Sequence, residues 1–338
     1  NLELDKPHAA TAIDGILHVV GSHNDQAARQ LVDLATGAVS EIEFFESHAS
    51  AAGPGGDTRG IIAQVTPTPL GILYVGETSE QTVGSAPTSW LTPSDPQGGV
   101  NSFGLPAGGF YLDVALDGTI VGSIVPAIYA THGSLPEVLP GSYAGAHDIS
   151  DNAEFIVGSV IWQRGNLDIY QVFETSGFDF TVSGGVPEWE AVELDPVSGL
   201  AIFAGTYFNL DTFTEEVGFW NQEGDFLFSA GANSTFMDFE VYDGQLVAAT
   251  NGLDDGRLIA ITDHSLIDLE EVLGEKTLLV DDGLYRGSVG IVGRNAAGQV
   301  FVSSFSPVPE PGSLLLLALA GPMLLSRCNR TRSARIFS

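Results

Sequence analysis

The chain is almost without cysteine, which sets the first limit on how it is stabilised. Its only cysteine, Cys328, lies ten residues from the end, so no disulfide can form within the chain. A zinc site built from several thiolates is excluded for the same reason. With 338 residues the chain is long enough to bury a sizeable core, and its stability must come from packing.

Basic residues are also scarce, and those present are unevenly placed. Only 12 Lys and Arg residues stand against 43 Asp and Glu. Four of the basic residues fall in the last twelve positions, so the rest carries eight basic against 43 acidic residues, a formal charge of −35. Such a body is repelled by phosphates and anionic headgroups, which excludes nucleic acid as a partner. The charge indicates either a well-hydrated surface or one that recruits divalent cations.

No motif of a known catalytic type is found. The sequence has no nucleophile elbow, no Gly-x-Gly-x-x-Gly and no Walker-type loop. His18 and His23 are too weak a pair to predict zinc. His147-Asp148 has the chemistry of an acid–base pair, but its position in other parts of the chain holds ordinary residues. We therefore predict that the protein is not an enzyme.

The body of the chain is built from a repeat. A turn that usually ends in Gly is followed by an apolar run and then small residues, on average about every 47 residues. Several units also share an upstream half, as in Asp113-Val114-Ala115-Leu116-Asp117 and His147-Asp148-Ile149-Ser150-Asp151. The seven apolar runs are residues 14–22, 71–76, 117–123, 154–159, 198–205, 243–249 and 298–303.

Each unit predicts about four short strands, which is typical of a β-propeller blade. We expect residues 1–305 to form an all-β propeller of about seven four-stranded blades; a pair of β-sandwiches is the alternative. Residues 24–34 and residues 263–273 are ambiguous: each segment fits a helix, and each fits a strand with a loop equally well. The ring must be closed by the N-terminus, either by residues 1–4 or by residues upstream. The unit resembles the HAF-type repeats of extracellular bacterial proteins, in which "DISxDG" precedes "VVG".

The end of the chain has three parts of different character. Residues 306–313 are rich in proline and contain Pro309-Glu310-Pro311, which holds the backbone extended. Residues 314–326 are an apolar run that spans roughly 22 Å as a helix, even when extended by two residues, against roughly 30 Å of hydrocarbon. Residues 327–338 form a basic tail. The leucines of the predicted membrane helix are Leu314, Leu315, Leu316, Leu317, Leu319, Leu324 and Leu325, and the stop-transfer arginines are Arg327, Arg330, Arg332 and Arg335.

This order of elements resembles the PEP-CTERM sorting signal of Gram-negative bacteria, with Gly312-Ser313 as a minor departure. The resemblance implies an exported protein, held transiently at the inner membrane and processed by an exosortase-type transpeptidase. It further implies a final place at the cell surface or in a matrix of exopolysaccharide, which would be a partner. Because Asn1 is not a start methionine, we expect the sequence to be either a fragment or a product from which a signal peptide has been removed.

Two functions remain open for the body. The first is a non-enzymatic binding or structural propeller, and the second is a secreted propeller lyase or glycosidase that acts on polysaccharide. No cofactor is expected apart from calcium, for which turns with paired acids are candidates; plain turns are the other interpretation. These acids are Asp254, Asp255, Asp281 and Asp282. The tryptophans, Trp90, Trp162, Trp189 and Trp220, are expected in the blade cores, with a sugar-binding platform as the alternative.

Overall fold

The computed structural model describes most of the body of the chain. Residues 1–304 form one compact unit, and residues 305–338 lie outside the described part. Within the body, the described residues are 2–45, 58–80, 84–92, 95–101, 110–123, 127–134, 136–141, 145–165, 169–183, 185–242, 244–253, 255–285 and 290–304.

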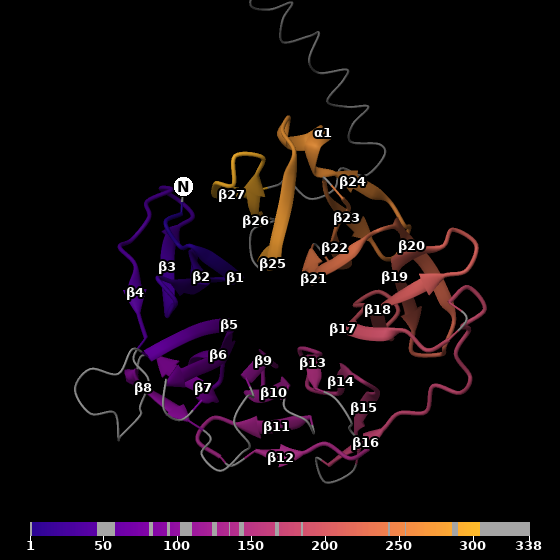
Figure 1. Ribbon diagram of the computed structural model, residues 1–338, viewed down its shortest axis with the longest axis horizontal. Coiled ribbons are helices and arrows are strands. Elements are labelled where there is room, and N and C mark those ends of the chain that lie inside the picture. The colour runs from indigo at the N-terminus through magenta and orange to yellow at the C-terminus, as the bar shows by residue number, and fades with distance from the viewer. Residues whose placement is uncertain are drawn as a thin grey trace, which may run out of the picture. The chain divides into compact units, whose positions relative to one another are not determined.

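The described strands form seven antiparallel sheets arranged around one axis, as Figure 1 shows. Blade 1 contains β1 (Lys6–Ile13), β2 (Ile16–His23), β3 (Gln26–Asp33) and β4 (Glu43–Phe44). Blade 2 contains β5 (Thr58–Thr68), β6 (Gly71–Glu80), β7 (Gly84–Thr92) and β8 (Asp95–Asn101). Blade 3 contains β9 (Phe110–Val114), β10 (Thr119–Ser123), β11 (Ile128–Thr131) and β12 (Glu137–Val138).

The second half of the ring repeats this order. Blade 4 contains β13 (Ala146–Ile149), β14 (Phe155–Gly158), β15 (Ile161–Arg164) and β16 (Tyr170–Val172). Blade 5 contains β17 (Glu188–Leu194), β18 (Ala201–Asn209), β19 (Thr214–Asn221) and β20 (Phe226–Ala232). Blade 6 contains β21 (Thr235–Tyr242), β22 (Gln245–Asn251), β23 (Gly256–Ala260) and β24 (Leu266–Asp268). Blade 7 has three strands, β25 (Thr277–Tyr285), β26 (Gly290–Asn295) and β27 (Val300–Ser304).

The predicted all-β propeller is therefore confirmed, and the pair of β-sandwiches is not. Of the two ambiguous segments, residues 24–34 contain strand β3, whereas residues 263–273 contain β24 and the short helix α1 (Leu269–Leu273). Asp268 caps this helix, because its carboxylate accepts a hydrogen bond from the Glu270 amide at 2.9 Å. No helix among the described residues is long and apolar enough to cross a membrane.

The hydrophobic core lies between neighbouring blades. All four tryptophans are buried, with exposed fractions of 0–1%, which confirms that they pack in the blade cores. Trp189 and Trp220 of blade 5 meet edge to face with ring centroids 5.4 Å apart, and Phe203 and Phe178 surround them. A platform of exposed tryptophans for sugar is therefore absent.

The ring closes where blade 7 meets blade 1. Val280, Val292 and Val300 of blade 7 share one core cluster with residues of blade 1, among them Leu17. Leu4 is buried in the same cluster, and the Leu2 amide donates a hydrogen bond to the Val300 carbonyl at 3.3 Å. The N-terminal residues thus cover the outer strand of blade 7, as predicted, although they form no regular fourth strand there.

The seventh repeat unit was placed one strand too far along the chain. In the first six units the predicted turn joins the two inner strands of a blade, as Asp14-Gly15 joins β1 to β2. The turn at Gly298 instead joins β26 to β27, the second and third strands. The turn sequence is the same at both places because any tight hairpin favours a glycine with positive φ, and Gly298 has φ 78°. The sequence pattern therefore cannot distinguish the two positions.

Each inner strand is irregular at the same place. In blades 1 to 6 the register between the first two strands shifts by one residue, which leaves a bulge. On the first strand, the residue just before the bulge pairs with a glycine of the second strand in five of these blades. In blade 6 it pairs with Thr250 instead. These glycines are Gly21, Gly76, Gly122, Gly158 and Gly205.

The repeated glycine is explained by the bulge that it faces. A Cβ atom on Gly158 would lie 2.2 Å from the Gly145 carbonyl oxygen, and one on Gly76 would lie 2.1 Å from that of Ile61. Both distances are far below contact, and both obstacles are backbone atoms that no side-chain rotation can remove. The glycine of "VVG" is therefore the residue that lets two strands approach beside the bulge.

We expect Gly158→Ala to lower the free energy of unfolding by about 1–3 kcal/mol or more, since the added methyl group overpacks a rigid site. The measurement is the midpoint of chemical denaturation. Gly177→Ala is the matched control, because a Cβ there meets no atom within 4 Å. Equal effects of the two substitutions would contradict this account.

Candidate functional site: the central cavity

The bulges place one side chain from each of six inner strands around the axis of the ring. The cavity at the axis has a volume of about 500 Å³, a size common for small-molecule sites. The extra residue of each of these six inner-strand bulges lines it: His8, Ala63, Leu112, His147, Glu190 and Met237. These side chains share no chemical type, so the repeat pattern alone did not mark them as a site.

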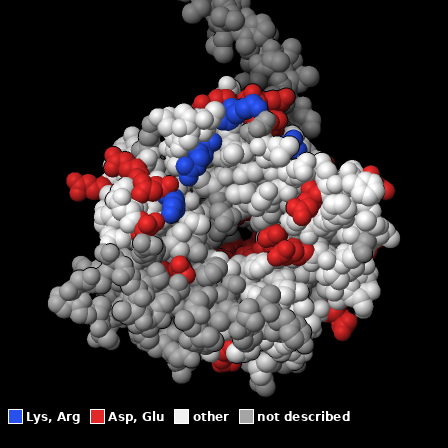
Figure 2. All heavy atoms as spheres, in the orientation of Figure 1, with Lys and Arg blue, Asp and Glu red and all other residues white. Residues whose placement is uncertain are grey.

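The cavity is strongly acidic. Seven carboxyl groups are among its lining residues, and no Lys or Arg is found among the lining residues that the structure describes. Figure 2 shows acidic side chains gathered at the central opening of the ring. We call these residues the central carboxyl cluster: Asp113, Asp148, Asp151, Glu190, Glu193, Asp238 and Glu240.

Three aspartates of this cluster join neighbouring blades. Each accepts a hydrogen bond from a backbone amide of the inner strand, or its bulge, in the next blade. Asp113 accepts from the Ile149 amide at 3.0 Å, Asp148 from Val192 at 2.7 Å, and Asp238 from Leu284 at 2.8 Å. Each of them is the residue directly after the bulge position. In blades 3 and 4 this aspartate belongs to the predicted upstream half of the repeat unit, which therefore holds blade to blade.

The candidate acid–base pair His147-Asp148 is engaged in the same joint. His147 Nδ1 lies 3.0 Å from the Trp189 carbonyl oxygen, so this nitrogen carries a proton and donates it. Both residues thus bind backbone atoms of blade 5, with Asp148 on Val192. Both side chains are therefore engaged in the joint between blades 4 and 5.

The glutamates of the cluster are held differently from the aspartates. Glu193 spans two blades, since its Oε2 accepts from the Asp151 amide at 3.1 Å and its Oε1 accepts from Leu194 at 2.7 Å. Burial raises the pKa of Glu193 to about 7. The hydrogen bond from the Leu194 amide lowers this pKa, and the nearby charge of Asp113 raises it. Burial also raises the pKa of Glu240 well above its usual value, and the Asp238 charge contributes.

Glu190 completes the set at the bulge of β17. Burial raises its pKa, while His147 acts in the opposite direction. Sequence reasoning did not find Glu190, Glu193 or Glu240, because Glu is common in this acidic chain and nothing in the local pattern distinguishes a Glu that faces the axis. Only the bulge register identifies them, and bulges are not visible in a strand pattern.

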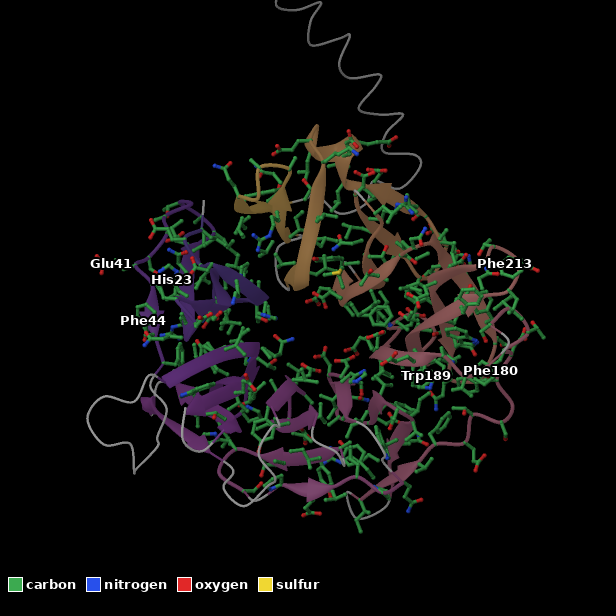
Figure 3. The ribbon with its side chains drawn as sticks, viewed as in Figure 1. His23, Glu41, Phe44, Phe180, Trp189 and Phe213 are labelled. Carbon is green, nitrogen blue, oxygen red and sulfur yellow. The ribbon has the colours of Figure 1, made fainter. Side chains whose placement is uncertain are left out.

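The histidines considered for zinc lie on β2 of blade 1 and are not among the residues that line the central cavity. His18 Nδ1 lies 2.9 Å from the Tyr74 hydroxyl, and burial together with Arg29 lowers the pKa of His18 to about 4. His23 lies beside Phe44, with ring centroids 6.0 Å apart (Figure 3). Across the part of the chain that the structure describes, no three His, Cys, Asp or Glu residues are placed to hold a metal ion.

The candidate calcium ligands have different outcomes. Asp281 and Asp282 lie inside strand β25, so the turn expected there does not form; the strand extends through them with an irregular register. Asp254 is outside the described residues. Asp255 Oδ1 is buried and has no hydrogen-bond partner among the described residues. The calcium prediction stays untested.

The sorting motif, the predicted membrane helix and its arginines also lie outside the described residues.

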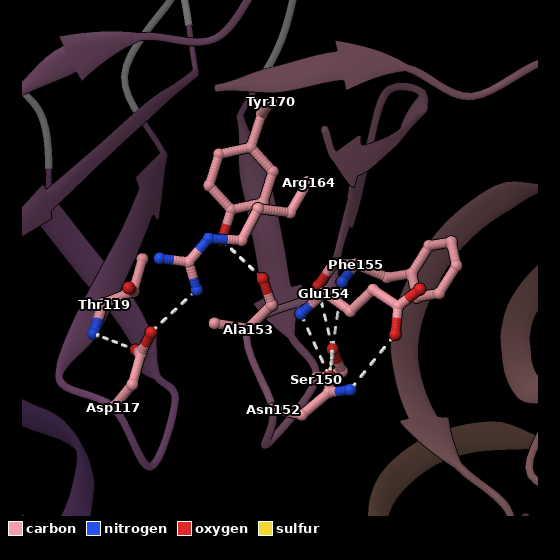
Figure 4. A network of polar contacts seen from close by, with 9 residues as sticks. All are labelled: Asp117, Thr119, Ser150, Asn152, Ala153, Glu154, Phe155, Arg164 and Tyr170. Atoms are coloured by element: carbon pink, nitrogen blue, oxygen red, sulfur yellow. Dashed lines mark hydrogen bonds and ion pairs between the residues drawn. The ribbon is translucent and has the colours of Figure 1, made fainter. Parts of the chain in front are cut away.

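A second joint, between blades 3 and 4, lies at the hairpin turns. Arg164 Nη1 of β15 lies 2.8 Å from Asp117 Oδ2, in the turn that joins β9 to β10 (Figure 4). In blade 4 the turn residue Ala153 has a positive φ of 58°, and the Tyr170 hydroxyl donates to its carbonyl at 2.8 Å. The hydrogen bond from buried Tyr170 helps to hold a backbone conformation that favours glycine.

Comparison with solved structures gives the same fold. A puromycin hydrolase matches with TM-score 0.52 and 12% identity over 90% of this chain and 55% of its own. The β-propeller domain of the Trilobed protease from Pyrococcus furiosus matches with TM-score 0.52 and 7% identity over 90% and 97%, respectively. A chain of the COPII outer coat matches with TM-score 0.52 and 10% identity over 90% and 86%.

At these identities the likeness shows a β-propeller and nothing further. The chain spans only about half the length of the puromycin hydrolase, and the three structures include hydrolytic enzymes and a coat protein. No protein-family model and no curated protein sequence matches the chain.

The blade joint at Asp148 can be tested directly. Asp148→Ala removes the acceptor and leaves the Val192 amide buried without a partner, which we expect to cost about 1–3 kcal/mol of stability. Asp148→Asn keeps an oxygen that can accept, so it should retain most of the stability. Denaturation midpoints of both variants give the difference, and the Val192 amide should exchange hydrogen faster only in the alanine variant. Equal loss in both would show that the charge, and not the hydrogen bond, matters.

Proposed function

We propose that this protein is an exported, exosortase-processed surface or matrix protein whose propeller is a non-enzymatic binding or structural body. The tail supports the sorting half of the proposal through its proline motif, apolar run and terminal arginines. The partner of the tail is an exosortase-type transpeptidase of a Gram-negative bacterium, and exopolysaccharide is the partner of the mature body.

One observation carries the non-enzymatic half of the proposal. Four of the side chains at the axis with the chemistry for acid–base work, His147 and the three aspartates of the blade joints, bind the backbone of the next blade. Groups occupied in this way support the ring and are not free to approach a substrate. The acidic surface, at −35 before the tail, suits a protein that stays soluble outside the cell.

Processing is tested by the mass of the mature protein. Cleavage at or near Pro311 should remove residues 314–338 from protein recovered from the native cell surface, and intact-mass measurement detects this. Glu310→Ala should trap the precursor in the membrane, whereas Glu223→Ala, at an exposed position of the body, should be processed normally. Replacing Arg327, Arg330, Arg332 and Arg335 should weaken retention at the membrane. A mature chain that still ends at Ser338 would show that the tail is a permanent anchor.

A second candidate function is a secreted propeller enzyme that acts on polysaccharide. The observation in its favour is the pair Glu193 and Glu240, because buried glutamates with raised pKa values in a cavity are typical of general acids. Under the non-enzymatic proposal, residues 1–306 should be soluble, monomeric and inactive against a polysaccharide panel.

The two functions are separated by turnover and its dependence on one carboxyl group. The enzyme would be established if a polysaccharide is turned over and Glu193→Gln or Glu240→Gln abolishes this turnover. Glu215→Gln, at an exposed position near the start of β19, should then leave turnover intact. Binding without turnover supports the first proposal. Running the panel with and without calcium also tests whether Asp255 and its neighbours take up this ion.

A further inference from the structure

The hairpin between β18 and β19 of blade 5 carries large apolar side chains on an exposed turn. Phe208, Leu210 and Phe213 are 47%, 51% and 75% exposed, respectively. The rings of Phe208 and Phe213 meet edge to face with their centroids 6.4 Å apart. Figure 3 shows Phe213 at the outer rim of the ring, away from the central opening. We call these three residues the blade 5 tip, and apolar groups gathered at one exposed place are typical of an interaction surface.

The turn holds Phe213 in a backbone conformation that a large side chain disfavours. Its φ is 57°, in the left-handed region where bulky residues are rarely found. Among the other described residues with positive φ, none carries a large apolar side chain. The equivalent hairpin of blade 1 turns through Asn24 and Asp25, which are polar and suit this conformation. The turn itself therefore does not require the phenyl ring, and strained residues of this kind cluster at functional sites.

A buried carboxylate holds the turn in place. Glu216 of β19 is only 3% exposed, and its Oε1 accepts hydrogen bonds from the hydroxyls of Thr212 at 2.8 Å and Thr214 at 3.2 Å. Its Oε2 accepts from the hydroxyls of Tyr207 at 3.1 Å and Ser229 at 2.5 Å. Burial by itself would raise the pKa of Glu216, but hydrogen bonds such as that from Ser229 outweigh it and lower the pKa to about 2. The support thus stays charged in neutral and mildly acidic media, and a turn held in this way loses little entropy when it binds.

The charge of the protein limits what the tip can bind. Asp211 lies in the same turn, is exposed and takes part in no ion pair among the described residues. The chain before the tail carries −35, so anionic lipids, acidic polymers and a second copy of the chain are repelled, whereas cationic partners are attracted. The partner therefore combines apolar surface for the rings with positive charge for the carboxylate.

We propose that the blade 5 tip, together with Asp211, binds an amino polysaccharide. The apolar C–H faces of its pyranose rings pack on Phe208 and Phe213, and an ammonium group donates a charge-assisted hydrogen bond to Asp211. A polymer presents the same unit repeatedly, so neighbouring units engage the two rings and their weak contacts reinforce one another. This inference rests on the proposed function, in which exopolysaccharide is the partner of the body, and it specifies where that partner binds and which charge it carries.

The first measurement is the binding of a glucosamine oligomer to the full chain, by titration calorimetry in mildly acidic buffer that keeps its amino groups protonated. Phe213→Gly should lower the affinity about tenfold, which is typical for loss of an anchor residue. The same substitution should raise the denaturation midpoint, because glycine adopts positive φ without strain. If the phenyl ring served only the fold, the midpoint would fall instead. Phe44→Ala, at an exposed phenylalanine of blade 1, is the matched control and should bind as the natural sequence does.

The second measurement compares oligomers of different charge. The natural sequence should bind the glucosamine oligomer most tightly, a neutral N-acetylglucosamine oligomer more weakly and an acidic alginate oligomer not measurably. Asp211→Asn should weaken binding of the cationic oligomer by roughly twofold to fivefold, the range for an exposed ion pair, and leave the neutral one unchanged. Glu223→Gln removes an exposed charge from the turn between β19 and β20 and should change neither affinity.

The outcomes distinguish failure of this inference from failure of the proposed function. If oligomers bind with the same affinity to Phe213→Gly and to the natural sequence, exopolysaccharide remains a partner but the blade 5 tip does not bind it. If no oligomer binds, the inference and the exopolysaccharide part of the proposed function both fail. In that case a protein adduct, formed at the native cell surface by a photoreactive Phe213→p-benzoylphenylalanine variant, would assign the tip to a protein partner.

Discussion

The bulge on the inner strand is the constraint on which the rest of this propeller depends. It adds one residue to the strand nearest the axis and brings the strand so close to its neighbour that only glycine fits opposite it in most blades. It also turns one side chain per blade toward the cavity and sets the next residue to bind the following blade. The close approach of the two strands, the side chains that line the cavity and the hydrogen bonds between blades thus all depend on the same bulge.

The sequence predicted the architecture well because propeller blades are repeated locally. Alternating apolar runs and Asp-Gly turns identify hairpins, and a recurring unit of four strands leaves few other folds. The position of the last unit failed, since the turn at Gly298 has the same chemistry as the turns between inner strands. The turn expected at Asp281-Asp282 is also wrong, because these residues lie inside strand β25.

The site was much harder to predict than the fold. A strand pattern shows which face of a sheet a residue occupies, but a bulge changes that face without leaving a mark in the sequence. Glu193 and Glu240 are therefore indistinguishable from the many surface glutamates until the register is known. His147 and Asp148 stood out for their chemistry, yet the structure explains them through hydrogen bonds to the backbone of blade 5.

The blade joints have a direction, and this affects how such a ring can change over evolutionary time. Each aspartate of the three joints binds forward, to the blade that follows it in the chain. A duplicated unit inserted between two blades would carry its own acceptor and amide, and both new joints would form without change elsewhere. Blades 1, 2 and 5 have Ala9, Gln64 and Ala191 in place of the aspartate at the joint position, so the scheme also tolerates the absence of this residue. Blade number can therefore vary by recombination, and only the seam between blades 7 and 1 must be remade.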